Sequence, residues 1–201
     1  MANNNKLYFY HSVMNSGKSA HIIMQVYNLR EQGNRVLVLK PRLDTRDTGV
    51  VKSRALNTRL ESILIDDSFS IFEYIKNERP DFVFVDEVNF LSDNNVEELS
   101  RVVDELGISV FAYGLLLDYL GFQFEGSKRM VEMADSIREL KSPCVKCGKK
   151  ATHHLRKSNK KYVFEGNPIH IGDTDIYESV CRSCYNTEKI NSSNAKYNDI
   201  N

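Results

Sequence analysis

Tyr8-Phe9-Tyr10-His11-Ser12-Val13-Met14-Asn15-Ser16-Gly17-Lys18-Ser19 is the stretch of this chain from which the fold can be predicted. Its first residues form an apolar run typical of a short buried strand. The run leads into a loop that ends in Gly-Lys-Ser, and a helical pattern follows. Backbone N–H groups at the start of such a helix, together with the helix dipole, favour an anion. The order strand, loop and helix therefore predicts a phosphate-binding loop.

The residue types of this loop suit a triphosphate. Lys18 supplies a mobile positive charge for the outer phosphates, and Ser19 supplies a hydroxyl group for Mg²⁺. Gly17 lets the backbone approach the phosphates closely. Ser12 departs from the usual pattern, which opens with Gly five residues before the Gly-Lys pair. The candidate phosphate site comprises Ser12, Val13, Met14, Asn15, Ser16, Gly17, Lys18 and Ser19.

A strand-helix-strand unit follows from the next residues. Apolar positions at helical spacing predict a helix over 19–32, and the apolar run 36–39 predicts a buried strand of a parallel sheet. The polar loop after this strand contains Asp44 and Arg46, at the sheet edge where ligands bind. These two residues are candidates to reach the transferring phosphoryl group. A solvated charged loop is the competing interpretation.

A second motif is expected beside the phosphate loop. The apolar run 82–85 is followed by Asp86 and Glu87, so two carboxylates stand at the tip of a buried strand. An aspartate in this place usually bonds the nucleotide's Mg²⁺ or its water ligands. Glu87 would point to the other side of the strand's end and act as a base. Two acidic residues that merely end a strand would be the interpretation if the motif stood alone.

The remaining patterns complete an α/β domain with a parallel sheet over residues 1–141. Residues 1–5 are expected to be disordered, and residues 47–62 give no clear pattern. The segment 114–126 would either wall a pocket for a flat ring or pack in the core. The other elements expected are a strand near 63, helices over 70–78, 92–106 and 128–140, and a strand over 110–113.

Beyond Pro143 the pattern predicts a small zinc-binding domain over residues 142–190. Two Cys-x-x-Cys pairs supply four thiolates, which suit a closed, structural zinc site. The residues between the pairs are expected to form a loop tied by the metal, with an extended ribbon over 166–177. His153 and His154 are expected at a loop surface or pocket edge, and residues 191–201 as a disordered tail. The zinc ligands are Cys144, Cys147, Cys181 and Cys184.

Composition argues against several functional classes without excluding a local basic patch. Lys plus Arg and Asp plus Glu number 27 each, so the chain has no global basic field for nucleic acid or membranes. No apolar run approaches the roughly 20 residues of a membrane helix, and the N-terminus does not resemble a secretion signal. We expect a cytoplasmic protein, with no nucleic-acid and no membrane partner, whose cysteines bind metal rather than form disulfides.

The order of motifs resembles the zinc-containing, cytosolic type of thymidine kinase. The resemblance spans Lys6 to Tyr185 and is carried by Met-Asn-Ser-Gly-Lys-Ser, Asp-Thr-Arg, Val-Asp-Glu-Val-Asn-Phe, Tyr-Gly-Leu and the two cysteine pairs. It implies a RecA-like P-loop domain and a zinc domain with a lasso loop that covers the nucleoside. It also implies transfer of the γ-phosphoryl of ATP to the 5′-hydroxyl of thymidine or deoxyuridine, a homotetramer, and feedback inhibition by thymidine triphosphate.

The same resemblance assigns roles to individual residues. Glu87 matches the catalytic base, Lys18, Ser19 and Asp86 match the Mg-ATP site, and Asp44 and Arg46 match the loop beside the 5′-hydroxyl. His154 departs from the family pattern, in which Ser or Thr is common, and so do Leu116 and Leu117. The thymidine pocket is matched by Met14, Phe90, Leu115, Tyr119, Phe124, Ile169, His170, Ile171, Gly172 and Tyr177.

Two other functional classes compete with a nucleoside kinase. One is a P-loop ATPase whose zinc ribbon binds nucleic acid, for which DNA- or RNA-stimulated hydrolysis would be diagnostic. The other is a non-catalytic zinc-ribbon interaction module, which leaves Asp86 and Glu87 without a role.

Overall fold

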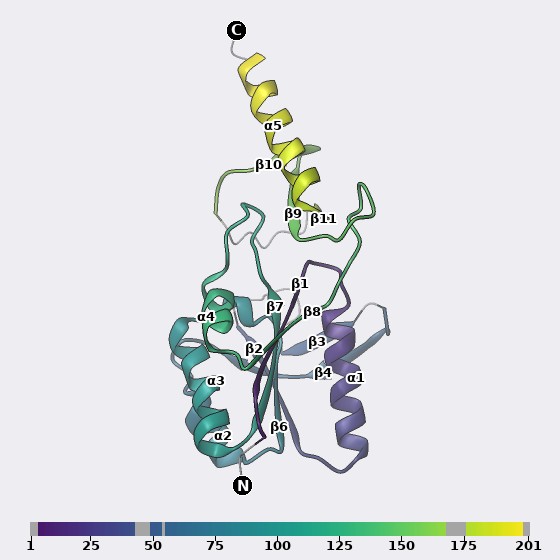
Figure 1. Cartoon of the computed structure of the whole chain (residues 1–201). Helices are drawn as coiled ribbons and strands as arrows, with labels where there is room; N and C mark the ends of the chain where they lie inside the picture. Colours follow the sequence, from purple (N-terminus) through teal and green to yellow (C-terminus); the bar gives the residue numbers. More distant parts are fainter. Residues whose placement is uncertain (1–3, 43–48, 54, 168–175, 199–201) are drawn as a thin grey trace. The chain divides into compact units, whose positions relative to one another are not determined.

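The computed structural model describes residues 4–42, 49–53, 55–167 and 176–198 (Figure 1). Contacts within the chain divide it into two compact units. Unit 1 comprises Met1–His11, Gly17–Leu116 and Phe124–Leu140, and unit 2 comprises Ser12–Ser16, Leu117–Gln123 and Lys141–Asn201. Among the described residues, no helix has the length and apolar character needed to cross a membrane.

Unit 1 is built on a six-stranded sheet of order β5-β2-β6-β7-β1-β8. Strand β2 pairs in parallel with β5 and β6, β6 with β7, and β1 with β8, which confirms the predicted parallel α/β fold. Its elements are β1 (Leu7–Ser12), α1 (Lys18–Glu31), β2 (Val36–Pro41), β3 (Val50–Ser53), β4 (Thr58–Glu61), β5 (Ile63–Ile65), α2 (Ile71–Glu78), β6 (Phe82–Val85), η1 (Val88–Phe90), α3 (Asp93–Leu106), β7 (Ser109–Leu115), α4 (Glu125–Met133) and β8 (Ser136–Glu139).

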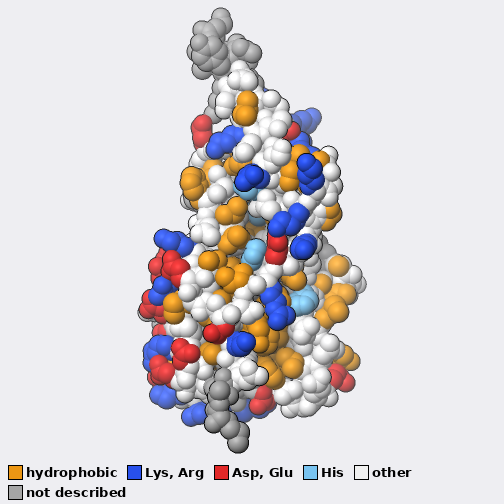
Figure 2. Space-filling view, in the orientation of Figure 1, with side chains coloured by type: hydrophobic (Ala, Val, Ile, Leu, Met, Phe, Trp, Pro, Cys, Tyr) orange, Lys and Arg blue, Asp and Glu red, His pale blue; other side chains and the backbone are white. Residues whose placement is uncertain are grey.

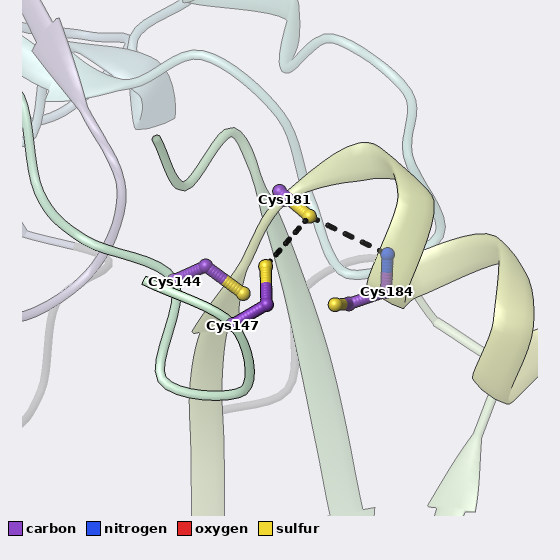
Figure 3. Close-up of side chains that lie close together, drawn as sticks. All are labelled: Cys144, Cys147, Cys181 and Cys184. Atoms are coloured by element: carbon purple, nitrogen blue, oxygen red, sulfur yellow. Dashed lines mark hydrogen bonds between the residues drawn. The ribbon is translucent and has the colours of Figure 1, made fainter. Parts of the chain in front are cut away.

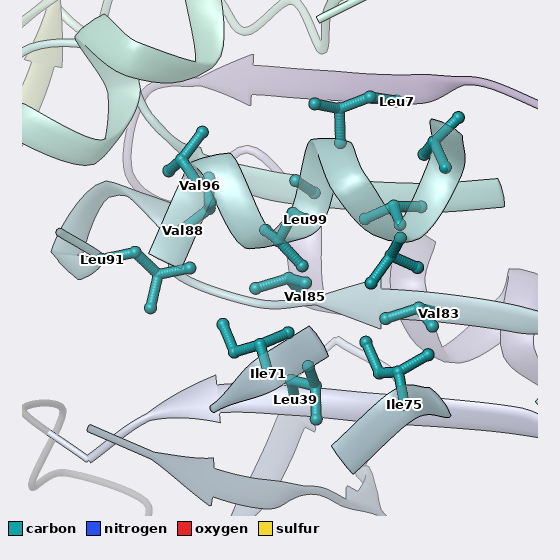
Figure 4. Close-up of a cluster of buried hydrophobic side chains, with 14 of the residues drawn as sticks. Leu7, Leu39, Ile71, Ile75, Val83, Val85, Val88, Leu91, Val96 and Leu99 are labelled. Carbon is teal, nitrogen blue, oxygen red and sulfur yellow. The ribbon is translucent and has the colours of Figure 1, made fainter. Parts of the chain in front are cut away.

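Helices cover the sheet on both faces because alternate strand residues point to opposite sides. Val83 and Val85 of β6 join the core beneath α2, α3 and α4, whereas Phe84 joins the core beneath α1. Figure 4 shows the first of these cores, in which Ile75 and Leu99 are fully buried. Each such side chain contributes about 1.5–3 kcal/mol through burial.

Aromatic rings dominate the sheet face beneath α1. Tyr8 stacks on Phe111 with ring centroids 4.7 Å apart, Phe84 stacks on Phe111 at 4.9 Å, and Tyr10 stacks on Tyr113 at 4.7 Å. The rings come from neighbouring strands, so they give this face a stiff, large-area contact for the helix that begins at Lys18.

The last helix of unit 1 is shorter than the sequence pattern predicts. A helix over 128–140 was expected, but α4 ends at Met133 and residues 136–139 form strand β8. The expectation was wrong because tertiary pairing decides this segment: β8 pairs with β1, and the amide of Leu7 donates to Asp135 Oδ2 at 2.8 Å. A line of spaced apolar residues could not reveal that partner.

Unit 2 contains a three-stranded antiparallel sheet of order β10-β9-β11 and a helix. The residues between the cysteine pairs, expected as a loop, supply strands to this sheet. His154 was expected at a loop surface or pocket edge, but it lies on β9 and is only 2% exposed. The elements are β9 (His153–Ser158), β10 (Lys161–Val163), β11 (Ile176–Val180) and α5 (Arg182–Asn198).

Three other segments differ from expectation. The uninterpreted region after Gly49 contains a hairpin, in which β3 pairs with β4. Asn5, expected to be disordered, accepts a hydrogen bond from Ser109 Oγ at 3.1 Å. The predicted disordered tail begins at 191, whereas α5 continues to Asn198.

Candidate active site

The predicted phosphate loop begins where β1 ends and leads directly into α1. Gly17, at the N-cap of α1, has φ 87°, and Asn15 has φ 57°, so the loop uses left-handed backbone at two positions. The N-cap residue Gly17 makes no side-chain capping bond, and N–H groups at the start of a helix favour an anion. Within the loop, the hydroxyls of Ser12 and Ser16 are hydrogen-bonded to each other.

The two acidic residues follow β6 as predicted, but the backbone turns sharply between them. Asp86 is 2% exposed, and its amide donates to the carbonyl of Leu39 at 3.0 Å. Glu87 has φ 53° and ψ 41°, a left-handed conformation that is uncommon for glutamate. Its amide donates to Asp86 Oδ1 at 3.1 Å, and its side chain is half-buried. Strained backbone of this kind gathers at functional sites.

The electrostatics of Asp86 connect it to the phosphate loop. Burial and the charge of Glu87 raise the pKa of Asp86, while Lys40 and Lys18 lower it. Both lysines are buried, with Lys40 3% and Lys18 7% exposed. Unit 1 therefore collects two buried cations and two acidic groups around the end of β6.

Lys40 was not identified as a site residue from the sequence, which placed it at the start of a loop. In the structure β2 extends to Pro41, and the register pairs Leu39 with Val85, so Lys40 and Asp86 are the next residues along the two strands. Lys40 Nζ donates to the carbonyl of Val50 at 3.1 Å. The signal in the sequence that could have identified Lys40 is its position directly after the apolar run 36–39.

A tyrosine and a histidine form a second group that sequence reasoning missed. Tyr113 is fully buried, and its hydroxyl lies 2.9 Å from Nδ1 of His21 in the first turns of α1. Burial raises the pKa of Tyr113 and lowers the pKa of His21, which favours the neutral form of both groups. This bond ties the start of α1 to β7.

The predicted nucleoside-lining residues of unit 1 lie near the ends of β6 and β7. Phe90 meets Phe124 edge-on with ring centroids 5.7 Å apart, and the amide of Leu115 donates to Asn89 Oδ1 at 3.0 Å. Phe90 also lines a cavity of about 300 Å³. The other residues lining this cavity are Pro41, Arg42, Ile65, Asp66, Asp67, Leu91 and Asn95.

Of the predicted nucleoside-lining residues of unit 2 that the structure describes, Tyr177 lies beside Tyr119. The ring of Tyr119 lies 6.5 Å from that of Tyr177, edge-on, and its hydroxyl donates to the carbonyl of Glu165 at 2.9 Å and lies 3.0 Å from that of Asn167. Arg156 donates to the same hydroxyl at 3.2 Å. Tyr119 thus holds the segment that leads into residues 168–175. Six site predictions lie outside the described residues, namely Asp44, Arg46, Ile169, His170, Ile171 and Gly172.

The four cysteines come together in unit 2, as Figure 3 shows. Their sulfur atoms all lie within 4.8 Å of one another, and those of Cys147 and Cys181 are 3.6 Å apart. Four thiolates bound tetrahedrally to zinc at about 2.3 Å would have sulfur atoms about 3.8 Å apart. The amide of Cys184 donates to the sulfur of Cys181, and this bond lowers the pKa of the Cys181 thiol. The cluster therefore has the spacing and chemistry of a zinc site.

Fold and site together define a P-loop α/β protein with an appended four-cysteine unit. The family model of thymidine kinase matches residues 5–185, and this chain belongs to that family.

Individual relatives agree with the family match. The chain is 45% identical over 183 residues to a thymidine kinase of Streptococcus agalactiae serotype Ia, a match covering 90% of this chain and 96% of the relative. It is 44% identical over 188 residues to a thymidine kinase of Streptococcus pyogenes serotype M28, a match covering 92% of this chain and 99% of the relative.

Proposed function

We propose that this protein transfers the γ-phosphoryl group of ATP to the 5′-hydroxyl of thymidine, and of deoxyuridine, to give the monophosphate. The supporting observations are the family match over residues 5–185 and the set of charges at the end of β6, where Lys18, distant in the sequence, lowers the pKa of buried Asp86 and the adjacent Glu87 raises it. This is the set of charges that phosphoryl transfer requires, since its loose transition state is stabilised by positioning and by cations.

In this proposal each acidic residue has a separate task. Asp86, with Ser19, would hold Mg²⁺, which neutralises charge on the phosphates. Glu87 would accept the proton of the 5′-hydroxyl, a contribution of about 10²–10⁴-fold to the rate. The left-handed backbone at Glu87 supports this division because it turns the chain away from the direction of β6 immediately after Asp86.

The remaining binding roles belong to the proposal as well. We assign Ser12–Ser19 to the phosphates, Asp44 and Arg46 to the region of the 5′-hydroxyl, and structural zinc to the four cysteines. We assign the nucleoside to the separate residues that match the thymidine pocket of the family, of which Met14 comes first in the sequence and Tyr177 last. The homotetramer and feedback inhibition by thymidine triphosphate rest on the same resemblance, and sedimentation and inhibition assays would test them.

A nucleic-acid-stimulated ATPase has less support. Figure 2 shows basic and acidic side chains mixed over the helices α2 to α4. Several of them are paired there, as in the contacts of Arg129 with Glu97 and Glu132 and of Arg101 with Glu105. These helices therefore lack the continuous basic surface that attracts a phosphate backbone, and the balance of 27 basic and 27 acidic residues gives the chain no global positive field.

One assay tests the proposal. Purified protein is incubated with Mg-ATP and a panel of nucleosides, and nucleoside monophosphate is detected by chromatography. Thymidine monophosphate is expected from the wild type and strongly reduced product from Glu87→Gln. Hydrolysis of ATP that depends on DNA or RNA, without any nucleoside monophosphate, would favour the ATPase instead.

A further inference from the structure

The peptide of Met14, in the middle of the phosphate loop, is held at both of its polar groups. Its amide donates to Nε2 of His154 at 2.9 Å, and its carbonyl accepts from Oγ of Ser179 at 2.9 Å. Ser179 and His154 face each other directly in the antiparallel pairing of β11 with β9. Directly opposed residues point to the same face of a sheet, so one face of unit 2 presents both groups to the loop.

The neighbouring residue of the loop is anchored in the same unit. Val13 is 4% exposed and belongs to the small core of unit 2, together with Leu155, Val180 and Tyr185. Cys144 and Cys181 are members of this core too. The loop residues Ser12–Ser16 accordingly belong to unit 2.

A hydrogen-bonded path joins this anchor to the cysteine cluster. The amide of Val145, between Cys144 and Cys147, donates to the carbonyl of Ser179 at 3.0 Å. Ser179 lies in β11, which ends at Val180, and Cys181 follows directly. The segment between Cys144 and Cys147 therefore holds the backbone of Ser179, and the side chain of Ser179 in turn binds the carbonyl of Met14.

We propose that His154 and Ser179 are positioning residues that set the conformation of the phosphate loop, and that the four-cysteine centre acts on nucleotide affinity through them. This inference rests on the proposed function, because it assumes that the loop binds nucleotide. Neither side chain needs to touch the nucleotide: each fixes the peptide of Met14, three residues before Gly17.

The side chain at position 154 must accept a hydrogen bond at Nε2, which requires that nitrogen to carry no proton. His154→Gln keeps an acceptor at similar reach, whereas His154→Leu fills the space and leaves the amide of Met14 unpaired. Losing a neutral hydrogen bond costs a few-fold in an equilibrium, and leaving a buried donor unpaired costs more. We expect Mg-ADP binding to weaken about tenfold or more in His154→Leu and about three- to tenfold in Ser179→Ala. Little change is expected in His154→Gln.

Matched controls are available for both substitutions. Ser109→Ala is the control for Ser179→Ala. Like Ser179, Ser109 is 7% exposed and makes a side-chain hydrogen bond, but it lies at the start of β7, at the opposite end of the strand from Leu115. His153→Gln alters the neighbouring residue of β9, whose Nδ1 pairs with Thr152. Both controls should bind Mg-ADP like the wild type, as measured by calorimetry, and all variants are checked for zinc content.

A local measurement removes any dependence on nucleotide. The chain has five methionines, so selective ¹⁵N-methionine labelling gives few amide signals, and Met24 within α1 serves as an internal reference. The amide of Met14 should be protected from hydrogen exchange in the wild type, in His154→Gln and in Ser179→Ala, and unprotected in His154→Leu. Extraction of zinc should also expose Met14 while Met24 remains protected.

The outcomes separate the two proposals. A wild type that neither binds Mg-ADP nor phosphorylates thymidine contradicts the proposed function. The exchange of Met14 then still decides whether His154 holds the amide of Met14. Rapid exchange of Met14 in the wild type, or Mg-ADP affinities of His154→Leu and Ser179→Ala within twofold of an active wild type, overturns the positioning role. Unchanged exchange of Met14 after zinc extraction overturns the coupling to the cysteine centre.

Discussion

Replacing Glu87 by glycine should leave the protein nearly inactive but more stable than the matched variant Glu87→Gln. Glu87 adopts φ 53° and ψ 41°, where an L-residue with a Cβ atom is strained and glycine is not. The same residue is the proposed base, so a position that costs stability is occupied by a side chain needed for the reaction. Natural sequences retain such strain mainly where function requires it.

The size of the effect follows from two opposing contributions. Left-handed backbone costs an L-residue about 1–2 kcal/mol, and glycine adds about 0.4–1 kcal/mol of unfolded-state entropy. Glu87→Gly should therefore be more stable than Glu87→Gln by about 0.5–1 kcal/mol, because both variants remove the charge and only glycine removes the strain. For a chain of this size, that difference raises the melting temperature by about 1–4 °C.

Urea denaturation and a thymidine phosphorylation assay test the two halves of this prediction. Arg79 is a matched control, since it has φ 49° and ψ 54° at the C-cap of α2, so Arg79→Gly compared with Arg79→Ala should show a similar stabilisation with unchanged turnover. Glu87→Gln and Glu87→Gly should both lose about 10²–10⁴-fold in kcat. Equal stabilities of the two Glu87 variants would refute the strain argument, and full turnover in either would remove Glu87 from the base role.

Three further predictions concern other parts of the site. Gly126→Ala should lower the free energy of unfolding by about 1–3 kcal/mol and reduce turnover, because the new Cβ would lie 2.6 Å from the carbonyl oxygen of Leu91, just after η1. Urea denaturation measures the loss, and a variant as stable as the wild type would contradict it. Tyr119→Phe removes the bond to Glu165 and should raise the KM for thymidine more than that for ATP, so equal changes would exclude the assignment. Burial raises the pKa of Asp86 to about 7, so Mg-ADP binding should release a proton below pH 7 and tighten as pH rises to about 7. Calorimetry in two buffers should show this proton in the wild type and not in Asp86→Asn, and equal release in both would exclude Asp86 as its source.

Local patterns identified much of unit 1 from the sequence. Ser70 caps α2 as predicted, with its Oγ accepting from the amide of Glu73. The apolar run before Asp86 forms β6, and the Gly-Lys pair begins α1. These features depend on neighbouring residues, so their signals lie within a few positions of each other. The convergence of four cysteines was predictable too, because two Cys-x-x-Cys pairs are typical of a four-thiolate zinc site.

The features that were missed depend on partners distant in the sequence. Lys40 acquires its place from the register of β2 against β6, and β8 exists because β1 offers it an edge. His154 is the sharpest case, since its nitrogen binds a backbone amide 140 positions earlier in the chain. The residue types of the phosphate loop identify it, but the groups that hold its central peptide come from a sheet beside the cysteine cluster. The family resemblance by itself would connect position 154 with the nucleoside, whereas the hydrogen bond to the amide of Met14 places His154 against the loop between β1 and α1.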